Sequence, residues 1–96
     1  MAPPSFRYSI ECKHYKTAPS FSSLVKQEFK LFDTWINQAK QDATNSGKEM
    51  LVIVKFNNVP EFVIVEQGEG AFSQYKGYSL ILLETWLDKA DTEFFE

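Results

Sequence analysis

A glutamate and a lysine stand two residues apart near the start of the chain. The segment SIECKHYK places Glu11 and Lys13 on either side of Cys12. Successive side chains of a β-strand point to opposite faces, so in a strand these two charged groups would project from the same face. Such a pair suits phosphodiester hydrolysis, in which a carboxylate holds a hard divalent cation and a nearby lysine positions water and offsets negative charge.

The same two residues are also compatible with an ordinary ion pair at the end of a strand. Exposed pairs of this kind are common and contribute little to stability. We expect Cys12 to face the core, with its backbone carbonyl still available as a ligand for a metal ion. The spacing alone leaves both interpretations open.

Two elements must position these groups. Alternating apolar and polar residues in SFRYSIECK predict a half-buried strand over residues 6–13. Apolar residues then recur every three or four positions, which predicts one long helix over residues 21–45, ended by Gly47.

The second half of the chain reads mainly as strands. The β-branched run MLVIVKF and the segment EFVIVEQ predict a hairpin over residues 50–66, turned at Asn57 and Asn58. Residues 68–77 are expected to form a loop. A strand at 78–83 and a short helix from about Glu84 follow, and a single helix from Leu80 is the alternative.

The resulting order, β-α-β-β-(β)-α, predicts an α/β fold with one long helix packed on a mixed sheet. A right-handed crossover would make the first strand parallel to the strand that begins near residue 50. One set of apolar residues should be buried together: Phe29, Phe32, Trp35, Ile36, Val52 and Val54.

Composition favours a single domain over residues 1–96. A chain of 96 residues with 44% hydrophobic and 16% aromatic residues can build one core but not two. It has one cysteine, no apolar run long enough to cross a membrane and no secretory signal pattern, so we expect a cytoplasmic protein.

Charge is distributed unevenly along the chain. Residues 1–55 carry eight Lys and Arg against five Asp and Glu, whereas residues 56–96 carry two against eight. The basic half would suit a polyanion, and Arg7, His14 and Lys16 are candidates for contacts with a nucleic-acid backbone. Scattered surface charge on a solvated strand edge is the alternative.

The segment IECK at a strand end, followed by a long helix and an apolar strand, resembles the PD-(D/E)xK nuclease superfamily. That group includes Holliday-junction resolvases and many restriction and phage enzymes. The run LFDTWINQAKQDATNSGKEMLVIVKFNN extends the similarity to about residues 8–66. The resemblance implies a partial restriction-endonuclease-like core acting on DNA with Mg²⁺ or Mn²⁺. It also implies that Glu11 is a metal ligand and Lys13 the catalytic lysine, with Gln27 or Gln38 as supporting residues.

One departure from the superfamily pattern concerns the expected Asp on a preceding strand. Residues 1–10 contain no Asp or Glu, so the nuclease domain is expected to be N-terminally truncated, with weak metal binding and weak or absent activity. An uncovered strand edge would favour a homodimer. A non-catalytic DNA- or partner-binding module, and an unrelated small phage or mobile-element protein, are the alternatives.

Overall fold

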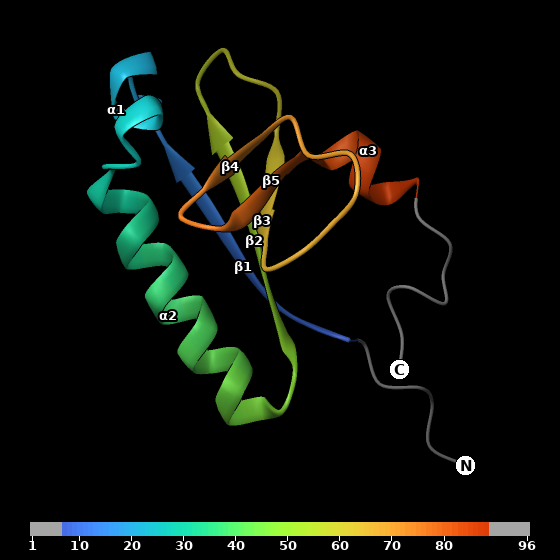
Figure 1. The fold of residues 1–96 in the computed structure, drawn as a ribbon. Coiled ribbons are helices and arrows are strands. Elements are labelled where there is room, and N and C mark those ends of the chain that lie inside the picture. Colours follow the sequence, from blue (N-terminus) through green and yellow to red (C-terminus); the bar gives the residue numbers. More distant parts are fainter. Residues whose placement is uncertain (1–6, 89–96) are drawn as a thin grey trace.

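A computed structural model describes residues 7–88, which form five strands and three helices (Figure 1). In chain order the elements are β1 (Tyr8–Tyr15), α1 (Phe21–Lys26), α2 (Lys30–Ser46), β2 (Glu49–Phe56), β3 (Phe62–Val65), β4 (Ser73–Tyr75), β5 (Tyr78–Leu82) and α3 (Leu83–Leu87).

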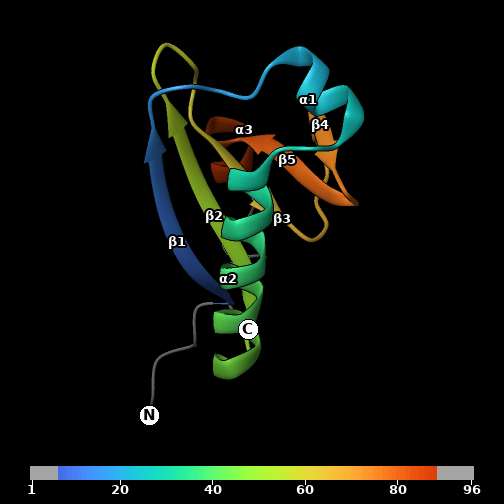
Figure 2. The same cartoon turned by 90° about the vertical axis from the view of Figure 1, so that its left-hand side faces the viewer.

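The five strands form one mixed sheet in the order β1-β2-β3-β5-β4. β1 pairs with β2 in parallel, and the other neighbours are antiparallel. α2 connects the two parallel strands and packs along one face of the sheet, whereas α3 lies on the other face (Figures 1 and 2). The predicted mixed α/β sheet, with a long helix packed on it, is confirmed.

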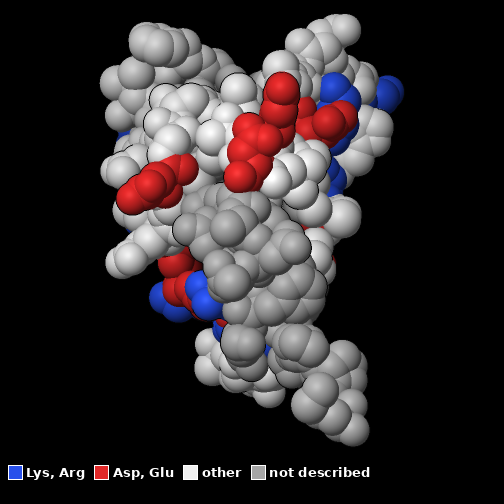
Figure 3. All heavy atoms as spheres, turned by 90° about the vertical axis from the view of Figure 1, so that its right-hand side faces the viewer, with Lys and Arg blue, Asp and Glu red and all other residues white. Residues whose placement is uncertain are grey.

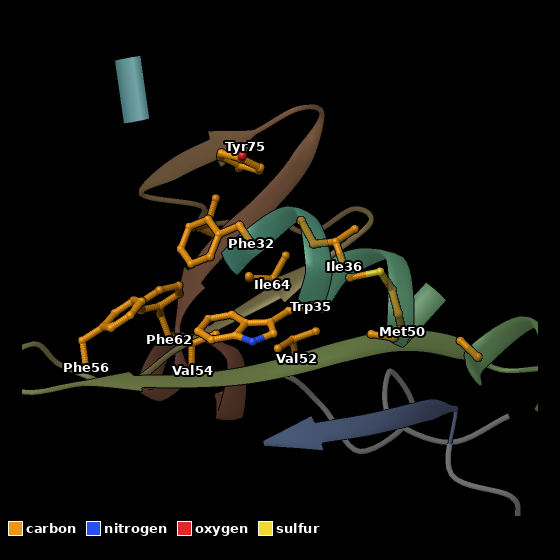
Figure 4. Close-up of a cluster of buried hydrophobic side chains, with 13 residues drawn as sticks. Phe32, Trp35, Ile36, Met50, Val52, Val54, Phe56, Phe62, Ile64 and Tyr75 are labelled. Carbon is orange, nitrogen blue, oxygen red and sulfur yellow. The ribbon is translucent and has the colours of Figure 1, made fainter. Parts of the chain in front are cut away.

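The main core lies between α2 and the sheet (Figure 4). Phe32 is fully buried and makes edge-to-face contacts with Phe29 and with Tyr75, at ring-centroid distances of 4.9 and 5.2 Å. Of the six residues expected to be buried together, five are buried, and Phe29 is partly buried against the same cluster. The helical periodicity of α2 therefore predicted its buried face correctly.

A smaller cluster covers the other face of the sheet. It is built on Leu51, Val63, Val65, Ile81 and Trp86. β2 contributes side chains to both clusters, as its nearly continuous apolar sequence indicates.

The predicted single helix over residues 21–45 is wrong in one respect, because it is broken between α1 and α2. Gln27 has a left-handed backbone (φ 59°) that ends α1, and residues 28 and 29 are not helical. Phe29, just after the break, packs on the core, whereas Val25 in α1 is 65% exposed.

A second difference is β4, which lies within the segment predicted to be a loop. Lys76 and Gly77 both have positive φ, so they make a two-residue turn that pairs β4 with β5. The strand and short helix expected from residue 78 are confirmed, and the alternative of one helix from Leu80 is wrong. None of the described helices has the length and apolar character required to cross a membrane.

Candidate active site

Glu11 and Lys13 lie on the face of β1 that is turned toward α2. The parallel ladder pairs Glu11 with Val52 and Lys13 with Val54, and both valines belong to the cluster beneath α2. Paired residues of neighbouring strands share a face, so both charged side chains point to the α2 side of the sheet. Each is half-buried.

These two side chains do not form an ion pair with each other. Within residues 7–88 the ion pairs are Arg7–Glu49, Lys40–Glu66 and Lys76–Asp33, with N–O distances of 3.9, 4.0 and 2.9 Å. Neither Glu11 nor Lys13 takes part in any of them. The described residues therefore give no support to the interpretation of a simple strand-end ion pair.

Gln38 lies on the side of α2 that faces β1. Lys40 approaches Glu66 and the ring of Tyr78, which places the Lys40 side of the helix toward β3 and β5. At 3.6 residues per turn, Gln38 is about 160° around the helix from Lys40, on the side of the sheet where β1 lies.

Gln38 and Glu11 also lie at similar distances from Gly47, measured along the helix for Gln38 and along the sheet for Glu11. Counting back from Gly47 at the end of α2, Gln38 is about 14 Å along the helix. Counting forward from Gly47, Val52 and its partner Glu11 are about 16 Å along the sheet. The fold therefore brings Gln38 to the same side of the sheet as both charged residues of β1 and to the level of Glu11.

Asp42 is a carboxylate on the same side of α2 that the sequence interpretation overlooked. It follows Gln38 by four residues, a spacing that puts two side chains on one side of a helix, and it is half-buried. It lies one turn closer to the end of α2, at the level of Ser9 rather than of Glu11. The i, i+4 spacing from Gln38 was the available signal.

Gln27 is held at the opposite edge of the sheet. Its amide nitrogen donates to the carbonyls of Leu24 and Gln74, at 2.7 and 3.0 Å, and its amide oxygen accepts from the backbone N–H of Lys76. These bonds join the end of α1 to β4, which is the strand farthest from β1. The structure therefore separates Gln27 from Glu11 and Lys13.

Cys12 is exposed, which corrects the expectation that it faces the core. It shares its face of β1 with Tyr8 and Ile10. Only Tyr8 is covered there, by an edge-to-face contact with Trp86 at 5.1 Å, while Ile10 is 47% exposed. The reason is that α3 has five residues and packs on β3 and β5, so it does not extend along β1.

The backbone carbonyl of Cys12 points away from β2. The Arg7 carbonyl accepts from the Glu49 N–H at 3.1 Å, and the hydrogen bonds of a parallel ladder engage every second residue of each strand. Residues 9, 11 and 13 therefore bond to β2, whereas the N–H and C=O groups of residues 10, 12 and 14 lie at the outer edge of β1. Within residues 7–88, no strand pairs with that edge.

The three candidates for nucleic-acid contacts do not form one cluster. Arg7 precedes β1 and pairs with Glu49, whereas Lys16 follows β1, so the strand separates them by about 25–30 Å. The ring of His14 lies on the face opposite Lys13, with Nε2 3.4 Å from Oδ1 of Asn57. Lys16 follows Lys13 by three residues, at the same end of β1. The face that carries α3 shows several acidic side chains, so it is the less suitable side for a polyanion (Figure 3).

A polar network at the β4 edge was not found from the sequence. The buried Tyr75 hydroxyl accepts from the Phe29 N–H at 2.7 Å and lies 2.8 Å from the Asp33 carboxylate, which Lys76 Nζ contacts at 2.9 Å. The hydrogen bond from Lys76 lowers the pKa of Asp33, and burial raises the pKa of Tyr75. No spacing in the sequence links Asp33 to Tyr75. The network anchors the start of α2, where Phe29 offers no side-chain cap.

An apolar pocket of about 240 Å³ lies between α1 and the sheet, away from Glu11. Its lining is entirely apolar: Ala18, Pro19, Leu24, Phe32, Phe56, Val59, Pro60, Phe62, Phe72, Leu80 and Leu82. It therefore offers no group for phosphodiester chemistry.

The residues at this site supply only some of the oxygen ligands that a divalent cation needs. The Glu11 carboxylate and the Cys12 carbonyl are hard oxygen donors of the kind that Mg²⁺ prefers. Within residues 7–88, however, no three side chains of His, Cys, Asp or Glu come together in a group that could hold a metal ion. Among the described residues, Glu11 is therefore not part of a three-side-chain cluster of this kind.

Comparison with known proteins identifies the family. The family described as "Phage putative PDDEXK endonuclease" matches residues 1–94, which is nearly the whole chain. No similar protein was found among curated proteins or among solved structures. The family match agrees with the element order and with the Glu-x-Lys pair on β1. The chain belongs to the phage PDDEXK endonuclease family.

Proposed function

We propose that this protein is a metal-dependent DNA endonuclease in which Glu11 and Lys13 are the reactive pair, and that one copy alone has weak or no activity. The observation that carries the proposal is the placement of both side chains on one face of β1, without an ion pair between them among the described residues.

Each residue has a distinct role in this proposal. The Glu11 carboxylate and the Cys12 carbonyl are the protein's ligands toward Mg²⁺ or Mn²⁺, a cation that would supply charge neutralisation and a more acidic bound water. The Lys13 ammonium orients the attacking water and faces the negative phosphoryl oxygens. Gln38, at the same level on α2, hydrogen-bonds water or substrate beside them.

In this proposal the second carboxylate comes from outside residues 7–88 of a single copy, because Asp42 lies at the level of Ser9 rather than of Glu11. Mg²⁺ bound by one carboxylate keeps most of its water and binds weakly. The outer edge of β1 is the place where another strand can bring such a group beside Glu11, because the backbone groups of residues 10, 12 and 14 are directed there.

Manganese binding and DNA cleavage test the proposal together. Mn²⁺ titration followed by electron paramagnetic resonance should show weak binding, with a Kd on the order of millimolar, and Glu11→Ala should remove it. Glu69→Ala is the control, since Glu69 is exposed in the β3–β4 loop.

Nicking of plasmid or branched DNA should be slow or undetectable at low micromolar concentrations of the chain, and Glu11→Ala or Lys13→Ala should abolish any activity present. Cleavage or Mn²⁺ binding that Glu11→Ala leaves unchanged would show the proposal to be wrong.

The incomplete donor set favours one second candidate function, which is DNA binding without cleavage. Lys13 and Lys16 have no carboxylate partner among the described residues; Lys13 lies near the end of β1, and Lys16 directly follows the strand. Binding through them should weaken steeply with salt, because phosphate contacts release counterions. Fluorescence anisotropy on short duplexes should show weaker binding by Lys13→Ala and Lys16→Ala than by Lys26→Ala. Metal-independent binding with no cleavage at any chain concentration would favour this second function.

A further inference from the structure

The outer edge of β1 is long and carries groups that can pair with another strand. β1 has eight residues, whereas β4 at the opposite edge has three. The N–H and C=O groups of residues 10, 12 and 14 lie along the outer edge, where no described strand is paired. Figure 2 shows β1 on the outer side of the sheet. Exposed edges of this length are templates for pairing with another chain.

The side chains along this edge complement a second copy of the same strand. In one antiparallel register of two β1 strands, the two Cys12 residues lie directly opposite each other; we call this pairing around Cys12. It puts Glu11 directly opposite Lys13 of the second copy, and Lys13 opposite the Glu11 of that copy. On the other face, Ile10 lies opposite His14 of the second copy, so the exposed isoleucine gains a neighbour. The overlap covers residues 9–15. Opposite charges at facing positions stabilise a strand pair.

Other two-fold registers are less favourable. Pairing around Glu11 puts the two glutamates face to face, and pairing around Lys13 does the same with the lysines. Pairing around Ile10 puts Lys13 opposite Arg7. Like charges directly opposite each other destabilise a strand pair. A register centred on Ser9 would put Glu11 opposite Arg7, but it pairs far fewer residues of β1, as does a register centred on His14. Charge and length of overlap together therefore favour the register around Cys12.

We propose that two copies of this chain join through β1 in this register and share one composite active site. This rests on the proposed function, and it identifies the source of the second carboxylate as Glu11 of the second copy. In this register the two Glu11 residues occupy diagonal positions, with Cα atoms about 7–8 Å apart on the same face. That spacing lets two glutamate side chains reach one divalent cation between them. The two α2 helices stand on the same face and bring a Gln38 from each copy to the site.

Disulfide cross-linking reports the register directly. The two Cys12 residues form a hydrogen-bonded pair with Cα atoms about 5.5 Å apart, within the range that a disulfide spans. Two thiols form one disulfide and transfer two electrons and two protons to diamide, which becomes the hydrazide. The wild-type chain, treated with diamide in EDTA, should therefore become a covalent dimer.

Variants with cysteines at other positions of β1 provide the matched controls. In a Cys12→Ser background, Ile10→Cys alone or His14→Cys alone should not cross-link, because the two copies of either residue lie about 13 Å apart along the strand. Ile10→Cys combined with His14→Cys should cross-link. Failure of the wild type to cross-link, or equal cross-linking by all single cysteines, would overturn the proposed register.

Charge exchange tests the association without any cysteine chemistry. Glu11→Lys and Lys13→Glu should each weaken self-association about tenfold or more, because each puts like charges opposite one another. An equal mixture of the two variants should restore it as a heterodimer, measured by sedimentation equilibrium in EDTA. Circular dichroism of each variant confirms that it is folded. A mixture that associates no better than the separate variants would count against the proposal.

Metal titration separates this proposal from the proposed function. Mn²⁺ should bind more tightly to the disulfide-linked dimer than to the Cys12→Ser chain at a concentration where that chain is monomeric. Equal binding by both would overturn the shared site. If Glu11→Ala leaves Mn²⁺ binding unchanged in every form, the proposed function fails, while the cross-linking and charge-exchange results still decide whether the dimer exists.

Discussion

The polar side chains at the two edges of the sheet differ in whether they have partners within the described chain. At the β4 edge, Tyr75 is fully buried and its hydroxyl joins Phe29 to Asp33, while Lys76 pairs with the same carboxylate. At the β1 edge, Glu11 and Lys13 point the same way, yet neither joins any ion pair within residues 7–88. One edge uses its polar groups to hold the fold together, and the other keeps them available.

This contrast separates stabilising residues from candidate functional residues. Among residues 7–88, every buried side-chain nitrogen or oxygen has a hydrogen-bond partner, so the interior is fully satisfied. Glu11 and Lys13, on β1, are among the charged residues that take part in none of the three ion pairs of the described part of the chain. Residues held for chemistry or binding commonly contribute little to stability, which gives a measurable distinction between the two edges.

The largest effect on stability is expected at the β4 edge, from Tyr75→Phe. The change removes the acceptor for the Phe29 N–H and leaves that group unsatisfied in a partly buried site. The free energy of unfolding should fall by about 1–3 kcal/mol. Urea denaturation followed by tryptophan fluorescence measures the change.

Tyr78→Phe is the matched control, because Tyr78 lies on the neighbouring strand β5 and is only half-buried. We expect it to change the free energy of unfolding by less than about 0.5 kcal/mol. Equal losses in the two variants would mean that the Tyr75 hydroxyl does not anchor α2.

Acid should remove a smaller part of this stabilisation, through Asp33. The hydrogen bond from Lys76 lowers the pKa of Asp33 below the ordinary value of 3.8, so the folded state favours the ionised carboxylate. Its contribution to stability is complete above that ordinary value and is lost as the pH falls through the lower pKa of the folded protein. Asp33→Asn keeps an acceptor for Tyr75 but removes the charge.

Urea denaturation of the wild type and of Asp33→Asn at several pH values tests this expectation. The wild type should keep its full advantage over the variant down to about pH 4 and lose it progressively as the pH falls further, through the lowered pKa of Asp33 in the folded protein. The effect should be smaller than that of Tyr75→Phe, since the pair with Lys76 is exposed to solvent and screened by it. A difference between the two proteins that stays constant down to pH 3 would contradict the assignment.

The sequence predicted those parts of the fold that depend on local periodicity. Alternation placed Glu11 and Lys13 together on one face, and the helical spacing placed Phe32, Trp35 and Ile36 in the core. Both results follow from residues close together in the chain, so they needed no knowledge of which elements meet.

The parts that could not be predicted depend on distant contacts. The break at Gln27 is stabilised by hydrogen bonds to Gln74 and Lys76, and apolar spacing across the break continues as if the helix were whole. The exposure of Cys12 depends on the length and position of α3, which lies some seventy residues later in the chain. Alternation defines two faces of a strand, but only the packed fold decides which of them is covered.

The smallest effect on stability is expected from the candidate active site itself. Glu11→Gln and Lys13→Met keep the size and the apolar stem of each side chain and remove only its charge. Because neither charge has an ion-pair partner in a single copy of the described chain, the free energy of unfolding of the dilute monomer should change by less than about 0.5 kcal/mol. Thermal or urea denaturation at low chain concentration measures this, and the same samples serve for Mn²⁺ and DNA binding. Loss of Mn²⁺ or DNA binding without loss of stability would identify these residues as functional rather than stabilising. A loss of 1 kcal/mol or more in either variant would instead mean that the β1 edge, like the β4 edge, uses its charges to hold the fold.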